Sequence, residues 1–156
     1  MAPDVLIILG SKTDAEVGKK AEAILKEFGI PHDMIVSSAH RTPEDLQRIV
    51  KASDAKVFIA IAGLSAALPG TIAAHTTRPV VGVPVSGKVN LDAILSVTQM
   101  PPGVPVAAVG LDRGENAALL AVQILALGDE GLVRKLREHR EAMKQWVLED
   151  SKSLGE

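Results

Sequence analysis

A short stretch near the start of the chain decides the fold: Val5-Leu6-Ile7-Ile8-Leu9-Gly10-Ser11-Lys12-Thr13-Asp14. It begins with an uninterrupted apolar run, which is typical of a strand buried on both faces of a parallel sheet. Residues Asp14–Phe28 then place apolar side chains at helical spacing, and Gly29 follows as a helix stop. Thr13 and Glu16 have the spacing of a capping box at the start of this helix. The stretch therefore predicts a strand, a tight loop and an amphipathic helix in succession.

The same alternation of strand and helix patterns continues along the chain. Further apolar runs occur at Met34–Val36, Val57–Ala62, Val80–Val85 and Val104–Val109. Thr42 and Pro43 mark the start of another helix, as a cap and a first helical residue. This alternation indicates a three-layer, doubly wound α/β fold of the flavodoxin or Rossmann kind, with a parallel sheet. Ligands of such folds bind beyond the carboxyl ends of the strands, so the loops there are the candidates for a functional site.

Composition limits the classes of function. The 156 residues suffice for a single domain, and their net charge of −2 argues against a general attraction to nucleic acid or to an anionic membrane. One Trp, two Phe and no Tyr leave few platforms on which bases could stack, and the lack of Cys excludes disulfides and thiol chemistry. The run Val5–Leu9 is too short for a signal core or a membrane span, so we expect a cytoplasmic protein.

The C-terminal part predicts one long helix after an α/β core of residues 1–128. Residues 129–156 form the rest of the single predicted domain, and an apolar stripe runs along their helix pattern: Leu132, Val133, Leu136, Met143, Trp146 and Val147. The stripe has two interpretations. It packs on its own domain, or it forms a contact between subunits, because it offers more apolar surface than a small sheet needs.

The loop Gly10–Asp14 is the first candidate binding loop. Gly10 permits a tight turn, while Ser11 and Thr13 offer hydroxyls beside a helix start that favours an anion. Asp14 would repel a phosphate and suits a ribose diol instead, because an ionised carboxylate only accepts hydrogen bonds. Thr13 and Asp14 are equally explained as helix caps.

The second candidate loop, Ser37–Pro43, has the most enzyme-like composition. His40 has the side-chain type suited to acid–base chemistry, and Arg41 beside it offers a planar, fork-shaped set of donors for a phosphate. A lone loop histidine is usually a surface residue. The hydroxyls and the arginine nearby favour a functional role here, with His40 as the acid–base candidate.

The third candidate loop, Ala62–Gly70, consists of small and apolar residues. Its glycines would let the backbone approach a ligand closely, although a tight turn explains them equally well. Ser65 supplies its only hydroxyl. Residues 84–88 and 99–103 could add walls to a site.

These loops together resemble the PurE family, whose class I members are N5-carboxyaminoimidazole ribonucleotide mutases. The matching strings are Gly10-Ser11-Lys12-Thr13-Asp14, Ser38-Ala39-His40-Arg41-Thr42-Pro43, Ala62–Gly70, Gly82-Val83-Pro84-Val85, Gln99–Val106 and Asn116-Ala117-Ala118-Leu119-Leu120-Ala121. They occur in order between Val5 and Leu127, over nearly the length of a whole single-domain member.

The resemblance implies a homo-octamer in which the C-terminal helix reaches over neighbouring subunits. It implies His40 as the acid–base residue, a ribonucleotide and CO2 as small-molecule partners, and no need for a metal, biotin or ATP. Asp14 would hold the ribose, with Arg41 and Ser11 near the phosphate. The substrate-binding residues that we predict are Ser11, Thr13, Asp14, Ser38, Ala39, Arg41, Gly63, Ser65 and Leu68.

Ala67 departs from the class I pattern, which has His at this position in Ala-Ala-His-Leu-Pro-Gly. Class II relatives, which carboxylate aminoimidazole ribonucleotide directly with CO2, also lack that His, but they tend to carry Lys where this chain has Arg41. We favour the mutase because more of the diagnostic residues agree with it, and keep the direct carboxylase as an alternative. A nucleotide-binding module without turnover is an alternative of another class, whereas the shortage of aromatic residues disfavours a flavin carrier.

Overall fold

The computed structural model describes residues 2–154 and contains one parallel sheet. Its strands are β1 (Val5–Leu9), β2 (His32–Val36), β3 (Val57–Ala62), β4 (Val80–Pro84) and β5 (Ala107–Ala108). Its helices are the 3-10 turn η1 (Lys12–Asp14), α1 (Ala15–Phe28), α2 (Pro43–Ala52), α3 (Leu68–Ala73), α4 (Asn90–Thr98), α5 (Gly114–Ala126) and α6 (Glu130–Ser153). The strand order is β2-β1-β3-β4-β5, which confirms the predicted doubly wound α/β fold.

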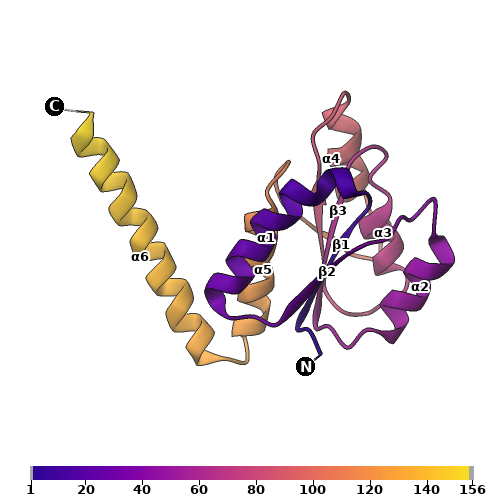
Figure 1. Ribbon diagram of the computed structural model, residues 1–156, viewed down its shortest axis with the longest axis horizontal. Coiled ribbons are helices and arrows are strands. Elements are labelled where there is room, and N and C mark those ends of the chain that lie inside the picture. Colours follow the sequence, from indigo (N-terminus) through magenta and orange to yellow (C-terminus); the bar gives the residue numbers. More distant parts are fainter. Residues whose placement is uncertain (1, 155–156) are drawn as a thin grey trace. The chain divides into compact units, whose positions relative to one another are not determined.

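The sheet is the middle of three layers. α1 and the first part of α5 cover one face, and α2, α3 and α4 cover the other (Figure 1). β1, β3 and β4 are buried along their whole length, as expected of uninterrupted apolar runs at the centre of a parallel sheet. On the α2–α3 side, Phe58, Leu46 and Ile72 belong to one core cluster and are fully shielded from solvent.

The two edge strands differ from the predicted runs. β2 begins at His32, before the predicted Met34, and its residues are half-buried or, at Asp33 and Val36, exposed. The run Val104–Val109 forms a strand only at Ala107–Ala108, which pair with Val81 and Gly82 and are exposed. An edge strand has one pairing partner, and Pro105 cannot donate to a ladder, so the short pairing here has a local cause.

The start of α1 also differs from the prediction. The Thr13–Glu16 capping box is wrong, because the reciprocal bonds form between Ser11 and Asp14 around η1. Glu16 bonds to Lys19 instead, at 2.8 Å. The predicted stop is confirmed, since Gly29 ends the helix in the left-handed conformation at φ 73°.

The chain divides into two compact units, one up to Ala121 and one from Val122 onward. The second unit contains the predicted long C-terminal helix, α6, which begins where the Asp129 carboxylate accepts hydrogen bonds from the amides of Gly131 and Leu132. Its apolar stripe is buried at Leu132 but open toward the C-terminal end of the helix, where Trp146 is 58% exposed and Val147 68%. No helix within residues 2–154 is both long and apolar enough to cross a membrane.

Candidate active site

The predicted site residues meet at the carboxyl ends of the central strands. β1 and β3 pair so that Leu9 lies beside Ile61, and the Gly10 amide donates to the Ile61 carbonyl at 2.9 Å. The chain leaves these neighbouring strands toward opposite faces of the sheet, which opens a crevice between their loops. A cavity of about 460 Å³ occupies this position.

The cavity is lined by the loops that follow β1, β2, β3 and β4. Its lining contains every predicted site residue: Ser11, Thr13, Asp14, Ser38, Ala39, His40, Arg41, Gly63, Ser65 and Leu68. Leu68 contributes little surface to the cavity, since the residue is 2% exposed and belongs to the core cluster. The lining also includes Leu64 and Ala66, which belong to the third candidate loop, and Val85 and Ser86, which belong to the predicted wall at residues 84–88.

Asp14 both shapes the first loop and faces the cavity. Its Oδ2 accepts a hydrogen bond from the Ser11 amide at 3.0 Å, and the Ser11 hydroxyl accepts one from the Thr13 amide at 3.4 Å. Burial raises the pKa of the Asp14 carboxyl, and the Ser11 amide and the Arg41 guanidinium offset part of this effect. The Asp14 carboxylate therefore caps η1 and not α1, at whose start it makes no side-chain capping bond, and it lies on the cavity wall.

Arg41 connects the first two loops. Its Nη2 donates to the Gly10 carbonyl at 2.8 Å, and its Nε donates to the Ser38 hydroxyl at 3.3 Å. Thr42 stabilises the same loop, because its hydroxyl donates to the Ser38 carbonyl at 3.2 Å and accepts from the Ser38 amide at 3.0 Å. These bonds place the guanidinium on the cavity wall before any ligand binds.

His40 lies on the exposed rim of the same loop, between Ala39 and Arg41. Among the described residues that line the cavity, the ionisable side chains are His40, Asp14 and Arg41. Only the histidine of these three ordinarily exchanges a proton near neutral pH. The cavity can therefore hold an anion and polar hydroxyls, and can move a proton at one position.

The third loop forms an apolar wall. Gly63, Ala66 and Ala67 present little beyond backbone and methyl groups, and Ala67 sits where α3 begins. The Ala67 carbonyl accepts a hydrogen bond from the Thr71 hydroxyl at 2.9 Å, which holds this turn in place. Such a wall offers few groups that water could bind.

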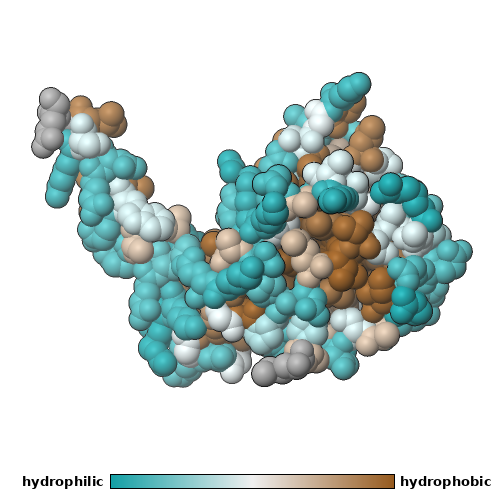
Figure 2. All heavy atoms as spheres, in the orientation of Figure 1, coloured by the Kyte–Doolittle hydropathy of each residue, from teal (hydrophilic) through white to brown (hydrophobic). Residues whose placement is uncertain are grey.

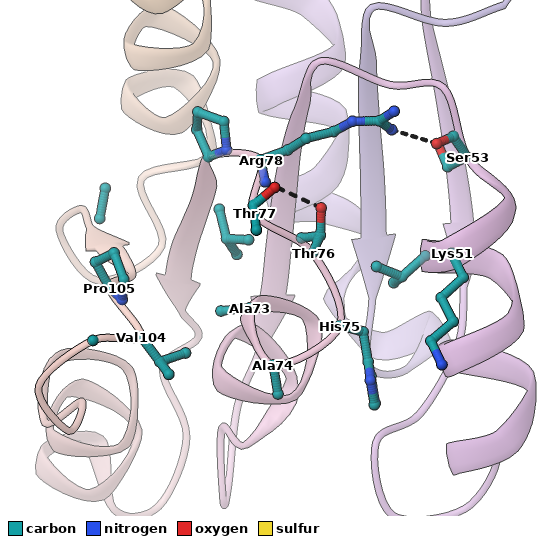
Figure 3. Close-up of a pocket in the computed structure, with 15 residues that line it drawn as sticks. Lys51, Ser53, Ala73, Ala74, His75, Thr76, Thr77, Arg78, Val104 and Pro105 are labelled. Atoms are coloured by element: carbon teal, nitrogen blue, oxygen red, sulfur yellow. Dashed lines mark hydrogen bonds between the residues drawn. The ribbon is translucent and has the colours of Figure 1, made fainter.

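A larger cavity, of about 1020 Å³, lies at the amino end of β4 and is lined by basic side chains (Figure 3). Arg78 extends toward Ser53 and donates to its carbonyl, whereas His75 and Lys51 point toward the other end of the cavity. The side chains of Arg78, His75 and Lys51 do not converge on one point. We therefore assign the chemistry to the smaller cavity.

Comparison with known proteins identifies the family of the chain. The family model described as AIR carboxylase matches residues 4–146. The chain belongs to the AIR carboxylase family. The family match includes residues 130–146 of α6.

Similar members of the AIR carboxylase family include curated and solved proteins. The chain is 56% identical over 153 residues to the N5-carboxyaminoimidazole ribonucleotide mutase of Methanocaldococcus jannaschii, covering 97% of this chain and 98% of that protein. It is 49% identical over 161 residues to the mutase of the same name from Bacillus subtilis, covering 99% of both. The crystal structure of Treponema denticola PurE matches with a TM-score of 0.87 at 32% identity, over 96% of this chain and 97% of that one. The resemblance to the PurE family is confirmed.

Proposed function

We propose that the chain is an N5-carboxyaminoimidazole ribonucleotide mutase, which converts its substrate to 4-carboxy-5-aminoimidazole ribonucleotide. The proposal rests on one observation above all: a chain that matches named mutases along its whole length gathers His40, Arg41 and Asp14 around one cavity at the switch point of the sheet. The purine-pathway reaction would take place in the cytoplasm.

The binding groups suit the parts of a ribonucleotide. Arg41 and the Ser11 hydroxyl would bind the phosphate, and Asp14 would accept hydrogen bonds from the ribose hydroxyls. The remaining predicted contacts, Thr13, Ser38, Ala39, Gly63, Ser65 and Leu68, surround the space between these groups. Because Arg41 already bonds to Gly10 and Ser38, little side-chain freedom would be lost on binding.

The proposed reaction moves a carboxylate from nitrogen to carbon. The N–C bond of the carbamate breaks, the amine nitrogen takes up a proton, and CO2 stays in the cavity. The ring carbon then forms a bond to CO2 and loses its own proton. His40 gives the first proton and receives the second, so the histidine ends the cycle as it began. The apolar wall of Gly63, Ala66 and Ala67 would retain CO2 close to the ring.

Ala67 supports one alternative reaction. Its methyl group leaves no titratable side chain at the position where the class I pattern has His, so an aminoimidazole ribonucleotide carboxylase that uses free CO2 is the second candidate. A binding module without turnover is the third, and His40 in the cavity speaks against it.

A pair of parallel assays tests these candidates. One supplies N5-carboxyaminoimidazole ribonucleotide without bicarbonate, and the other supplies aminoimidazole ribonucleotide with bicarbonate. We expect the first to be faster. Efficient use of CO2 with no turnover of the carbamate would identify the direct carboxylase, and activity in neither assay would identify a binding module. His40→Asn is the matched inactive variant, and we expect it to bind substrate without turning it over.

The proposal includes a homo-oligomer whose subunit contacts involve α6. The resemblance to the PurE family implies that this oligomer is an octamer. Two exposed apolar features support contacts between copies. One is the stripe of α6 that carries Trp146 and Val147. The other lies over β2, between α1 and α2, where Figure 2 shows hydrophobic side chains at the surface and Val36 is 54% exposed. Apolar area of this kind is usually covered by a partner.

A further inference from the structure

Asp112, in the turn between β5 and α5, has an unusual backbone conformation. Among residues 2–154 it is the non-glycine residue with a positive φ, at 59°. Asp and Asn adopt this left-handed region more readily than other residues with side chains. The turn lies at the carboxyl end of the sheet, the same end as the cavity.

Three hydrogen bonds connect Asp112 to separate parts of the α/β unit. Its amide donates to the Pro84 carbonyl at the end of β4, at 2.9 Å. Its Oδ1 accepts from the Ser86 amide at 2.8 Å. Its carbonyl accepts from Nζ of Lys20, on α1, at 3.2 Å. The residue therefore joins β4, the loop after β4 and α1.

The turn that carries Asp112 is itself firmly placed. On one side, the Val109 amide donates to the Gly82 carbonyl at 3.1 Å. On the other, Gly114 packs directly on α1, since a Cβ at this glycine would lie 2.1 Å from the Val17 carbonyl oxygen. Asp112 is thus a fixed point from which its carboxylate can hold another segment.

The segment that it holds is a wall of the cavity. Val85 and Ser86 both line the cavity, and the Val85 amide is bound to the Ala62 carbonyl of β3 at 3.0 Å. Ser86 is exposed, and its amide is bound by Asp112. The amides on either side have acceptors of their own, because Val85 donates to Ala62 and the Gly87 amide donates to Oδ1 of Asn90 at 2.8 Å. The Asp112 carboxylate therefore decides where Ser86 lies between these two anchors, and its loss would give the Ser86 peptide more conformations.

We propose that Asp112 is a positioning residue that fixes the Val85–Ser86 wall of the substrate cavity. This inference rests on the proposed function for its ligand, a ribonucleotide. The wall follows β4, whereas His40 follows β2 at the far edge of the sheet. We therefore expect the loss of the Asp112 carboxylate to weaken nucleotide binding and to leave the rate of proton transfer at His40 unchanged.

Substitutions at Asp112 separate the carboxylate from the backbone conformation. Asp112→Ala removes both the acceptor and the tolerance of positive φ, and Asp112→Gly removes only the acceptor. Asp112→Asn keeps both. We expect KM for the ribonucleotide to rise about tenfold in the Ala and Gly variants. Their kcat should stay within about twofold of the wild-type value, and the pH dependence of kcat should keep its shape. The Asn variant should recover the wild-type KM. Asp54→Ala, an exposed change at the other end of the sheet, is the control.

Hydrogen exchange at the Ser86 amide provides a readout without substrate. We expect protection of this amide in wild type and in Asp112→Asn, and its loss in Asp112→Ala and Asp112→Gly. An unchanged KM in Asp112→Ala, a normal KM in Asp112→Gly, or equal Ser86 protection in all variants would overturn the inference. A wild-type protein that turns over neither ribonucleotide would instead refute the proposed function, and the exchange data would still test the role of Asp112.

Discussion

At the scale of the residue, Asp14 serves two purposes with one carboxylate. It accepts the Ser11 amide, which fixes the first loop, and it faces the cavity. Burial raises the pKa of the Asp14 carboxyl, so the ionised form costs free energy in the empty protein. A ribose diol would supply two donors to this carboxylate and restore part of the hydration that folding removes.

Replacing Asp14 with Asn should therefore stabilise the empty protein while it weakens binding. Because the folded-state pKa is raised, the contribution of Asp14 to stability is fully present below the unfolded pKa of about 3.9 and is lost as the pH rises through the folded pKa. The amide of the substituted side chain cannot ionise and does not suffer this loss. We expect a higher free energy of unfolding for Asp14→Asn near pH 7, a difference that shrinks toward about pH 4, and a KM raised about tenfold.

Urea unfolding across this pH range, at one protein concentration, measures the first effect, and steady-state kinetics measures the second. An advantage of Asp14→Asn that grew toward acid pH would contradict the assigned cause of the pKa shift. For the unfolding measurement, Thr13→Val is a suitable comparison, since it changes a neighbouring loop side chain without altering any ionisable group.

At the scale of the element, the contact between α1 and α5 depends on a missing side chain. Gly114 opens α5, and its Cα approaches the backbone of Val17 so closely that no Cβ fits. The neighbour is backbone, which cannot rotate away as a flexible side chain can. The contact holds the turn that carries Asp112 against α1.

Gly114→Ala should consequently push α5 away from α1. A Cβ placed 2.1 Å from the Val17 carbonyl oxygen forces a backbone shift, and we expect a loss of about 2 kcal/mol or more in the free energy of unfolding. Denaturant unfolding measures this change. Gly128→Ala is the matched control, because its Cβ would meet no atom within 4 Å. Equal stability of the two variants would show that α5 moves without cost.

At the scale of the whole molecule, the strand order brings the functional loops together. The loops after β1 and β3 are neighbours because these strands pair, although α1, β2 and α2 separate them along the chain. His40 and Ser86 then approach the cavity from the two flanking strands. The exposed end of the α6 stripe belongs to this scale too, because its apolar side chains are not buried within their own unit.

Charging that stripe should dissociate the proposed oligomer. Trp146 and Val147 are largely exposed within their unit, and a carboxylate buried in a subunit contact costs several kcal/mol. We expect an octamer for wild type and smaller species for Trp146→Glu, by light scattering after size-exclusion chromatography. Ser151→Glu adds the same charge without removing an apolar side chain and should leave the mass unchanged. An octameric Trp146→Glu variant would show that the stripe lies outside the contacts.

Much of the site could be predicted from local sequence. The apolar runs that became β1 and β3 are too long and too apolar for a surface, and a parallel sheet buries both faces of its central strands. Glycine, hydroxyl and charged residues directly after such runs then had to lie at the carboxyl edge of the sheet. This reasoning located His40, Arg41 and Asp14 in one cavity.

Tertiary structure decided what depends on residues far apart in the chain. Asp112 gave no local signal, because its role arises from a hydrogen bond to Ser86 across 26 positions. The capping partner of Ser11 likewise followed from the environment of its segment. The short β5 follows from both its edge position, which only the strand order reveals, and Pro105. The hydrophobic periodicity and the residue propensities of a segment depend on its own backbone conformation and on which of its faces is buried. They therefore determine strands, helices and loops. Which loops meet, and which side chain fixes the wall between them, is determined by strand pairing and packing over the whole unit.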